Sequence, residues 1–333
     1  MFKSTKLLIA ILGTVGLTVA SAEIPRTPDG KPNLQGTWAN NAATPLERPV
    51  QLADKATLSD EEVAEFQAKH DKLFDGEGEA AFGDSVFNSV LADDQEHESY
   101  DPDTGNYNHF WVVERNFENR TSLIVDPPNG RMPPLTTEAE AAQAERVAYA
   151  EAHPADSYTD RINSDRCITF GVPFFMAGYN GYFEITQSAS HVAVMQEMAH
   201  ETRLIPVDNR PHIPGQIEQW MGDSKGRWED DTFVVETKNL SDQAVFLTHP
   251  ASNLHLVERY ELMDADTLMW TITVNDETVW QAPWTMQINL KRSAEPIYEY
   301  ACHEGNESMT GILAGHRAEE AEQAASQSSG GGQ

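Results

Sequence analysis

Several motifs that identify common cofactor-dependent enzymes are absent from this sequence. It has no Walker phosphate loop, no Gly-x-Gly-x-x-Gly turn after a strand, and no His-Glu-x-x-His zinc motif. The pairs His200-Glu201 and His303-Glu304 begin like the zinc motif but lack its second histidine. A Cys-x-x-Cys-His haem-attachment motif is also missing. We therefore predict a protein with no cofactor and no resident metal.

Cysteine is nearly absent as well, since Cys167 and Cys302 are the 2 cysteines of the 333-residue chain. In an exported protein, two cysteines favour a disulfide over thiolate chemistry. We predict a Cys167–Cys302 bond, which would stabilise the fold by roughly 4–5 kcal/mol because it closes a very long loop. Thiolate ligation and nucleophilic catalysis are the alternatives.

Long apolar runs are confined to the N-terminus. Lys3 and Lys6 precede the run LLIAILGTVGLTVA, and the small residues ASA follow at positions 20–22. A positive start, a short apolar core and a small-residue cleavage point predict a secretory signal peptide over residues 1–22. The run is too short for a membrane span. We expect a periplasmic or secreted protein, without membrane insertion, that begins at Glu23.

Basic residues are scarce relative to acidic ones. The chain has 23 Lys and Arg against 53 Asp and Glu, which gives a formal net charge of −30. An acidic surface repels nucleic acids and anionic lipids, so we exclude both as main partners. A small-molecule ligand or substrate remains the expected partner, and the composition leaves the oligomeric state open.

The region from about residue 109 to 317 has the alternation of a β protein. In WTMQINL, Trp284, Met286 and Ile288 alternate with polar residues, which is typical of a strand with one buried face. Similar stretches with short turns continue to PIYEYAC at 296–302. No strand–long helix–strand rhythm indicates a parallel sheet. The sequence therefore predicts a mainly β fold, an antiparallel lipocalin-like barrel or a sandwich.

Two helices are predicted beside the strands. Ser59 is a good N-cap, and Glu62 three residues later completes a capping box before an amphipathic stretch that ends near Phe74. The alanine- and glutamate-rich segment near 137–152 predicts a helix inserted into the β domain.

Composition divides the rest of the chain. We expect residues 23–108 to form an extended and helical segment that packs on the barrel. Within it, the acidic, glycine-containing stretch at 75–108 is interpreted as a surface excursion. The tail at 318–333 is low in complexity and is predicted to be disordered.

Four stretches carry a resemblance to known proteins: RTSLIVDPPNGR, QWMGDSKGRWEDDTFVVET, NLHLVERY and EYACHEGN. Together they resemble a widely distributed group of uncharacterised exported bacterial proteins, over about Gln35 to Gly315. This resemblance implies export but no particular activity, and it transfers no functional residue. The stretch NLQGTW at 33–38 is also similar to the start of lipocalin-like (calycin) barrels, where Gly-x-Trp closes one end.

Ionisable residues occupy positions that should face the core of the predicted strands. Glu258 shares a face with apolar residues in LHLVERY. In VAVMQEM, Glu197 lies on one face and Gln196 on the other, so one of the two side chains points inward. Buried charges are costly unless they are paired. The pattern indicates either structural ion pairs or the polar floor of a ligand pocket. The arginines available to pair with Glu197, Glu258 and Glu299 are Arg203, Arg227 and Arg259.

The loop at 208–228, DNRPHIPGQIEQWMGDSKGRW, is the strongest candidate for a functional site. It is long for a connection between strands, and such loops often carry function. His212 lies between two prolines, which would hold a general base or a ligand contact in place. The alternative is a packed loop in which Trp220 and Trp228 cap the barrel.

The candidate site residues fall into two groups. The predicted catalytic residues are His212, Asp223, His255 and Glu258. The predicted ligand-binding residues are Tyr179, Glu197, Arg203, Trp220, Arg227, Arg259, Glu299, His303 and Glu304. The aromatic stretch FGVPFFMAGYNGY at 170–182 is expected to line the entrance. Three scattered histidines have the right type for metal ligation but no diagnostic spacing. They are His212, His255 and His303.

Three functions agree with these observations. The first is a protein that binds a small, partly apolar ligand in a barrel pocket. The second is a cofactor-independent hydratase, lyase, isomerase or cyclase that uses a histidine–carboxylate pair. The third is an envelope interaction protein without a pocket. A pocket lined by aromatic side chains would favour binding, which is our leading hypothesis, whereas a deep histidine–carboxylate pocket would favour the enzyme.

Overall fold

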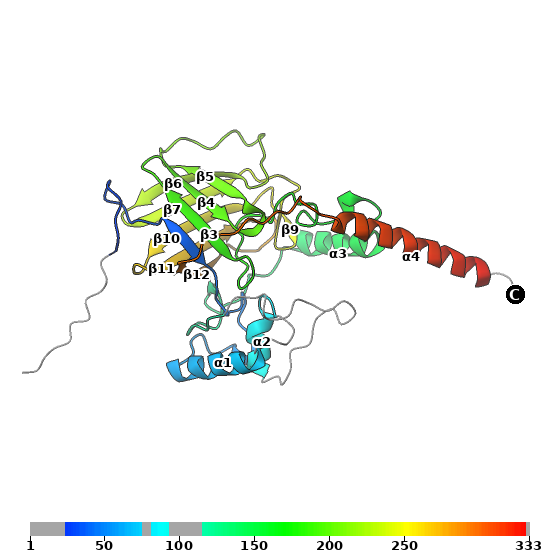
Figure 1. Ribbon diagram of the computed structural model, residues 1–333, viewed down its shortest axis with the longest axis horizontal. Helices are drawn as coiled ribbons and strands as arrows, with labels where there is room; N and C mark the ends of the chain where they lie inside the picture. Colours follow the sequence, from blue (N-terminus) through cyan, green and yellow to red (C-terminus); the bar gives the residue numbers. More distant parts are fainter. Residues whose placement is uncertain (1–23, 75–80, 93–114, 331–333) are drawn as a thin grey trace, which may run out of the picture.

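The computed structural model of the chain describes residues 24–74, 81–92 and 115–330, so the predicted signal peptide lies outside the described residues. The α-helices labelled in Figure 1 are α1 (Asp60–Leu73), α2 (Ser85–Ala92), α3 (Thr137–Ala152) and α4 (Ser308–Gly330). The strands are β1 (Gly36–Ala39), β2 (Ile124–Asp126), β3 (Tyr182–Gln187), β4 (His191–Gln196), β5 (Thr202–Pro206), β6 (Asp223–Glu229), β7 (Thr232–Lys238), β8 (Val245–Phe246), β9 (His249–Pro250), β10 (His255–Leu262), β11 (Thr267–Asn275) and β12 (Trp284–Ser293). Short 3-10 helices cover Val50–Leu52, Tyr158–Asp160 and Met198–His200.

Ten of the strands form one antiparallel sheet, which confirms the predicted mainly antiparallel β fold. The order is β5-β4-β3-β1-β12-β11-β10-β7-β6, and β2 pairs with β12 beside this path. Strands β8 and β9 form a separate pair. Within the described residues, no hydrogen-bonded ladder joins the edge strands β5 and β6. The sheet is therefore not closed into the barrel that we expected.

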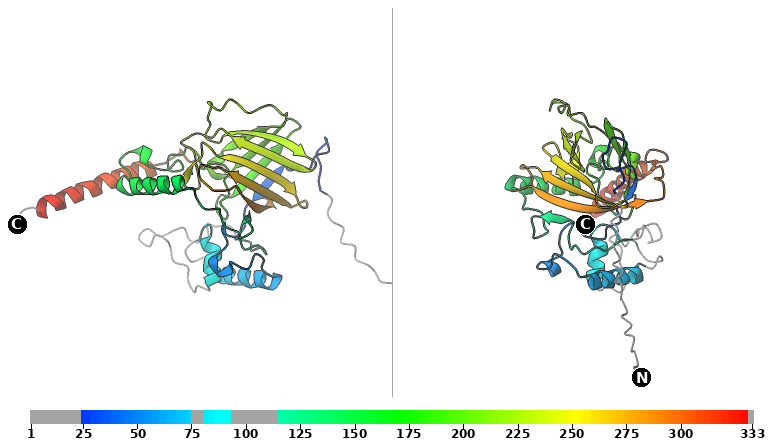
Figure 2. Two further views of the ribbon diagram at one scale, coloured as in Figure 1. Left: turned by 180° about the vertical axis from the view of Figure 1, so that it is seen from behind. Right: turned by 90° about the vertical axis from the view of Figure 1, so that its left-hand side faces the viewer.

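The sheet is nevertheless strongly curved, as Figure 2 shows. Arg203 on the edge strand β5 forms an ion pair with Glu258 on β10, although five strands separate β5 from β10 in the sheet order. At the other edge, a Cβ added to Gly226 of β6 would lie 3.0 Å from Ile205 of β5. The two edge strands thus approach each other through side chains instead of backbone hydrogen bonds.

Large side chains fill the concave side of the sheet. The period-2 pattern predicted from residue 284 onward is confirmed, because buried and partly buried residues alternate along β12 up to Leu290. Trp38, Trp270 and Trp284 are almost completely buried, and Trp38 donates a hydrogen bond to the Leu34 carbonyl at 2.8 Å. The concave face is therefore a packed core.

Both predicted helices are present. The Ser59 hydroxyl accepts a hydrogen bond from Glu62 N at 3.2 Å, and the Glu62 carboxylate accepts one from Ser59 N at 2.9 Å, so the capping box of α1 is confirmed. The Thr136 hydroxyl caps α3 by accepting a single hydrogen bond from Ala139 N at 3.1 Å. Helix α2 lies within the stretch at 75–108 that we interpreted as a surface excursion, but it packs against α1 through Phe87 and forms a second small core. Residues 75–80 and 93–108 of that stretch lie outside the described residues.

Two local predictions are wrong. PIYEYAC at 296–302 forms no strand, because no neighbouring strand pairs with it in the described structure. Residues 318–330 of the tail that we expected to be disordered belong to α4, whose alanine- and glutamate-rich sequence has high helix propensity, and residues 331–333 lie outside the described residues. Figures 1 and 2 show α4 extending from the body beside α3. None of the described helices is long and apolar enough to cross a membrane.

Candidate functional site

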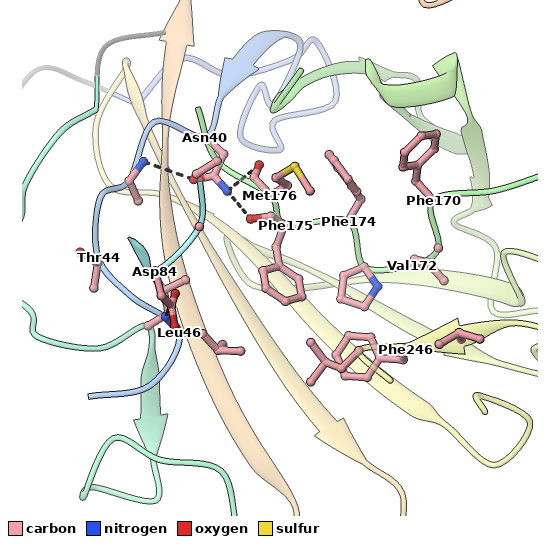
Figure 3. Close-up of a pocket in the computed structure, with 18 of the residues that line it drawn as sticks. Asn40, Thr44, Leu46, Asp84, Phe170, Val172, Phe174, Phe175, Met176 and Phe246 are labelled. Atoms are coloured by element: carbon pink, nitrogen blue, oxygen red, sulfur yellow. Dashed lines mark hydrogen bonds between the residues drawn. The ribbon is translucent and has the colours of Figure 1, made fainter. Parts of the chain in front are cut away.

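An apolar pocket of about 330 Å³ lies between the sheet and the N-terminal helical segment (Figure 3). Its walls come from the segment after β1, the residues just before α2, the loop at 170–177 and strand β8. The aromatic stretch that we expected at a pocket entrance therefore does line a pocket, but one outside the concave core. Its aromatic lining comprises Phe170, Phe174, Phe175 and Phe246.

The loop at 170–177 is held in place by two buried polar side chains. Asn40 is 1% exposed and donates a hydrogen bond to the Phe175 carbonyl at 2.7 Å. Arg115 is also 1% exposed and donates to the carbonyls of Ala42 and Ala177, each at 3.2 Å. Burial lowers the pKa of the Arg115 guanidinium to about 10, and the charge of Asp84 opposes this shift. These side chains position the aromatic wall.

Thr44 and the solvent-exposed Asp84 line the opposite end of the pocket. Figure 3 shows both residues near Leu46, away from Phe170. Asp84 Oδ1 accepts a hydrogen bond from Leu46 N at 2.8 Å. Partial desolvation raises the pKa of the Asp84 carboxyl, and the Leu46 hydrogen bond opposes this shift. Neither polar residue was predicted, because they lie in irregular segments that carry no sequence pattern.

Two predicted catalytic residues, His212 and Asp223, are in contact. His212 Nδ1 lies 2.8 Å from Asp223 Oδ2, and the same oxygen accepts a hydrogen bond from Ile213 N at 2.9 Å. Lys225 Nζ lies 2.7 Å from the other Asp223 oxygen. An Asp–His pair of this kind can hold an imidazole for proton transfer. It also fixes the loop at 208–222 to strand β6.

The third predicted catalytic residue, His255, belongs to the same polar cluster. Its Nε2 lies 2.8 Å from Glu236 Oε1, and His212 Nε2 lies 3.8 Å from Glu236 Oε2. Burial lowers the pKa of His255, and Lys238 lowers it further. These side chains lie on the face of β6, β7 and β10 opposite to the core, and none of them lines the aromatic pocket.

The fourth predicted catalytic residue, Glu258, is a structural residue. It is 0% exposed, and its carboxylate receives Arg203 nitrogens at 2.6 and 2.9 Å. The Tyr260 hydroxyl and Trp270 Nε1 donate to it at 2.9 and 3.2 Å. The prediction that Glu258 points into the core is confirmed, and its pairing with Arg203 is one of the ion pairs expected from the sequence. A carboxylate surrounded in this way is not available to a substrate.

The other predicted arginine pairs differ from the expectation. Arg227 Nε donates to Glu229 Oε1 at 2.9 Å, and Arg259 donates to Glu229 Oε2 at 2.8 Å. Both pairs are exposed, because β6 and β10 present these residues away from the core. Glu197 is 7% exposed, and its burial raises its pKa, but it lies after β4 and pairs with no arginine in the described structure.

The remaining predicted ligand contacts are scattered. Trp220 and Trp228 each pack against the core, as the packed-loop alternative requires. Tyr179 makes an edge contact with Phe82 at a centroid distance of 5.9 Å. The residues exposed near the disulfide are Glu299, His303 and Glu304. The structure does not bring this set together.

Residues 222–226 read Gly-Asp-Ser-Lys-Gly, which has the letters of the Gly-x-Ser-x-Gly nucleophile motif. In hydrolases that motif forms a sharp strand-to-helix turn that exposes the serine. Here it leads into strand β6, and Ser224 is 8% exposed with its Oγ 2.8 Å from Thr237 Oγ1. The serine faces the core side, away from His212 and Asp223, so these residues do not form a catalytic triad.

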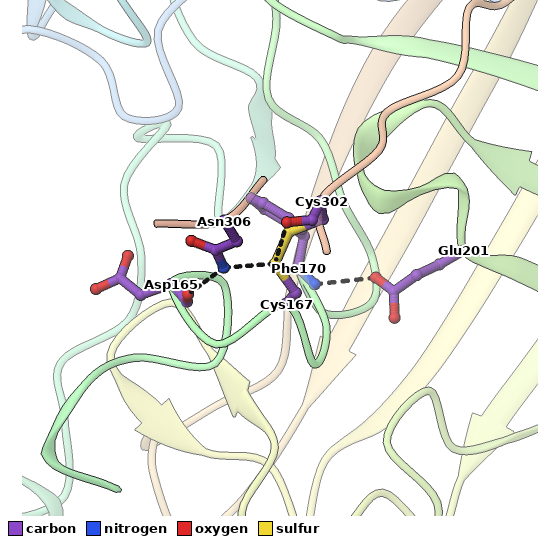
Figure 4. Close-up of a disulfide and its surroundings, with 6 residues drawn as sticks. All are labelled: Asp165, Cys167, Phe170, Glu201, Cys302 and Asn306. Atoms are coloured by element: carbon purple, nitrogen blue, oxygen red, sulfur yellow. Dashed lines mark hydrogen bonds between the residues drawn. A yellow bond between two sulfur atoms is a disulfide. The ribbon is translucent and has the colours of Figure 1, made fainter. Parts of the chain in front are cut away.

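The predicted disulfide is confirmed, since Cys167 and Cys302 are bonded across a sequence separation of 135 residues (Figure 4). Asn306 donates a hydrogen bond to Cys167 Sγ at 3.2 Å. Glu201 accepts a hydrogen bond from Phe170 N at 2.9 Å, three residues beyond the cysteine. The start of the aromatic loop is thereby attached both to the C-terminal segment and to the β4–β5 connection.

One group of described residues places three possible metal-ligand atoms close together. Asp156, His316 and Glu320 have ligand atoms within 4.8 Å of one another. The two carboxylates are exposed, and His316 also faces Glu319. Ion pairing between α4 and the segment after α3 accounts for the arrangement.

Comparisons of the chain with protein-family models, curated proteins and solved structures gave no match. The resemblances to exported bacterial proteins and to lipocalin-like barrels therefore remain predictions. The described residues form a mainly antiparallel β protein with one large curved sheet. A disulfide anchors one of its loops, and aromatic side chains line a pocket beside that loop.

Proposed function

We propose that the protein binds a small, largely apolar molecule in the pocket beside the loop at 170–177. The observation that carries this proposal is the 330 Å³ pocket with four phenylalanines in its wall. Small-molecule sites are usually apolar concave pockets with a few placed polar groups, and this volume lies at the lower end of their range. At about 30 Å³ per water molecule, the pocket has room for about ten non-hydrogen atoms.

The proposed site differs from the barrel interior that the sequence favoured. The concave face of the sheet is occupied by large side chains and by the Arg203–Glu258 pair, so a ligand there would have to displace them. We place binding in the periplasm or outside the cell, because the disulfide suits an oxidising compartment. The predicted signal peptide supports the same compartment.

A second candidate function is acid–base catalysis without a cofactor. It is favoured by one observation, the 2.8 Å contact between His212 and Asp223. It ranks below binding because lysines accompany both carboxylates of the cluster, and because His212 does not line the aromatic pocket. A binding function requires only the pocket.

Equilibrium dialysis with naphthalene tests the binding proposal. We expect saturable binding of one naphthalene per chain, since its ten carbons match the pocket volume. Val245→Trp should weaken binding at least tenfold, because Val245 lines the pocket. The residue is 49% exposed, so the larger side chain should leave the fold intact. Met263→Trp, at an exposed turn elsewhere, is the matched control. No saturable uptake, or equal uptake by both variants, would contradict the proposal.

A further inference from the structure

We propose that the ligand is an amphipathic carboxylate. Its apolar chain occupies the aromatic-lined pocket, and its carboxylate binds Arg166 in a polar pocket next to it. This inference rests on the proposed binding function and specifies the chemical class of the ligand.

The polar pocket has a volume of about 440 Å³ and adjoins the aromatic-lined pocket. Both pockets are lined by Phe170, Gly171, Val245 and Leu247. Figure 3 shows Phe170 at the end of the aromatic-lined pocket opposite to Thr44, so the polar pocket begins at that end. Val245 and Leu247 are 49% and 37% exposed, which places the shared wall at the surface. A ligand chain that extends past Phe170 therefore reaches the polar pocket.

Arg166 lines the polar pocket as a cation without a counter-ion. The residue is half-buried, and its guanidinium carbon lies 5.4 Å from the ring centroid of Tyr158. This cation–π contact orients the side chain without neutralising its charge. Within the described residues, Arg166 forms no ion pair and donates no hydrogen bond. Its N–H groups are therefore available to an acceptor on a ligand.

The charge of the polar pocket is opposite in sign to that of the whole chain. The sequence has a formal net charge of −30, yet none of the described residues that line this pocket is Asp or Glu. Arg161 also lines it, and its charge is balanced by Asp165, which lies outside the lining at 2.8 Å from Arg161. One positive charge thus remains uncompensated. It matches a carboxylate, which carries one negative charge.

Two further side chains of the polar pocket can donate hydrogen bonds. Ser164 and Gln243 line it, and neither side chain forms a hydrogen bond within the described part of the chain. A serine hydroxyl and a glutamine amide can both donate to a carboxylate oxygen. The guanidinium of Arg166 can donate to both oxygens of a carboxylate at once, which makes arginine a strong partner for this group. A cationic ligand would meet Arg166 instead and be repelled.

Three ten-carbon compounds test the head group in equilibrium dialysis with the full protein. Decanoate is anionic, decan-1-ol is uncharged, and decyltrimethylammonium is cationic. We expect decanoate to bind about tenfold more tightly than decan-1-ol, because hydrogen bonds between two charged groups are stronger than neutral ones. We expect decyltrimethylammonium to bind more weakly than decan-1-ol. Unspecific attraction to a chain of net charge −30 would give the reverse order.

Substitutions of Arg166 provide the second arm. Arg166→Gln should reduce the preference for decanoate over decan-1-ol to about twofold or less, with the decan-1-ol affinity retained. Arg166→Lys keeps the charge and should keep a preference of several fold, so it distinguishes lost recognition from a disturbed fold. Arg26→Gln removes the same charge from an exposed pair with Asp231 and lines neither pocket, so it is the matched control with wild-type behaviour expected.

The outcomes separate this inference from the proposed function. Equal binding of decanoate and decan-1-ol to the wild type overturns the carboxylate inference, while saturable binding of naphthalene leaves the proposed function in place. Tighter binding of decyltrimethylammonium than of decanoate also overturns the inference. A decanoate preference that persists in Arg166→Gln overturns the role of Arg166. If naphthalene and all three ten-carbon compounds fail to bind, the proposed function fails, and the inference fails with it.

Discussion

Glu258 and Arg203 form an ion pair inside an apolar core, where each charge is stabilised by the other. Both oxygens of Glu258 receive Arg203 nitrogens, and Tyr260 and Trp270 donate two further hydrogen bonds. The desolvation of these charges is expensive, so such a pair is tolerated only when its hydrogen bonds are complete. The pair also connects edge strand β5 to β10, which helps to hold the sheet in its curved form.

Glu258→Gln should therefore destabilise the protein strongly. The substitution leaves the buried Arg203 charge without its counter-ion, a loss that typically costs about 3–5 kcal/mol. The measurement is urea unfolding followed by tryptophan fluorescence. Arg259→Gln, on the same strand as Glu258, breaks an exposed pair with Glu229 of β6 and should leave the midpoint unchanged. A Glu258→Gln protein that unfolds at the wild-type midpoint would refute a structural role for this pair.

At the scale of elements, helix α3 is attached to the β8–β9 pair near a buried histidine. His249 is 6% exposed and makes an edge contact with Trp280 at a centroid distance of 5.7 Å. Arg146 of α3 lies 3.3 Å from His249 Nδ1, and Gln143 donates to Thr248 Oγ1 at 3.1 Å. Burial lowers the pKa of His249, and the charge of Arg146 lowers it further.

This contact predicts a loss of stability in mild acid. An unfolded histidine has a pKa of about 6.5, so below that pH the unfolded chain gains a proton that folded His249 resists. The free energy of unfolding should therefore fall as the pH decreases from 7.5 to 5.5. His249→Gln removes this titration, so its free energy of unfolding should change less over the same interval. Identical pH slopes for the variant and the wild type would contradict the prediction.

Elements with local signals were predictable, and elements that depend on distant partners were not. The capping box of α1 needs only Ser59 and Glu62, and both of its hydrogen bonds were readable from the sequence. PIYEYAC has the alternation of a strand, but a strand also needs a neighbour, and none pairs with it in the described structure. Helix α2 depends on burying Phe87 against α1, a tertiary contact that its short sequence does not reveal.

The candidate site was predictable to a similarly limited degree. Alternation along β10 placed Glu258 on the inner face, but it could not show whether that face was hollow. The answer depends on how side chains such as Trp38 and Trp270 fill the space across the curved sheet. The aromatic stretch at 170–182 predicted part of a pocket wall, and residues 170–177 do line the pocket. Its polar partners, Thr44 and Asp84, come from irregular segments that only the folded chain brings together.

At the scale of the whole molecule, the disulfide and the pocket belong to one structural unit. The segment that begins at Cys167 continues into the aromatic wall, and it is held at four places, one of them the Ala177 carbonyl, which accepts a hydrogen bond from Arg115 at 3.2 Å. The disulfide holds its start, Glu201 holds Phe170 N at 2.9 Å, and Asn40 holds the Phe175 carbonyl at 2.7 Å. A disulfide to Cys302 therefore limits the motion of the pocket wall.

Removal of the disulfide should consequently weaken ligand binding as well as stability. A Cys167→Ser, Cys302→Ser variant should lose about 2–5 kcal/mol of unfolding free energy. At a temperature where circular dichroism shows it folded, naphthalene affinity should fall severalfold, because a wall freed at one end must be ordered again on binding. Unchanged affinity in a destabilised variant would mean that the remaining hydrogen bonds suffice to order the wall. The disulfide would then have no effect on ligand binding, which contradicts this prediction.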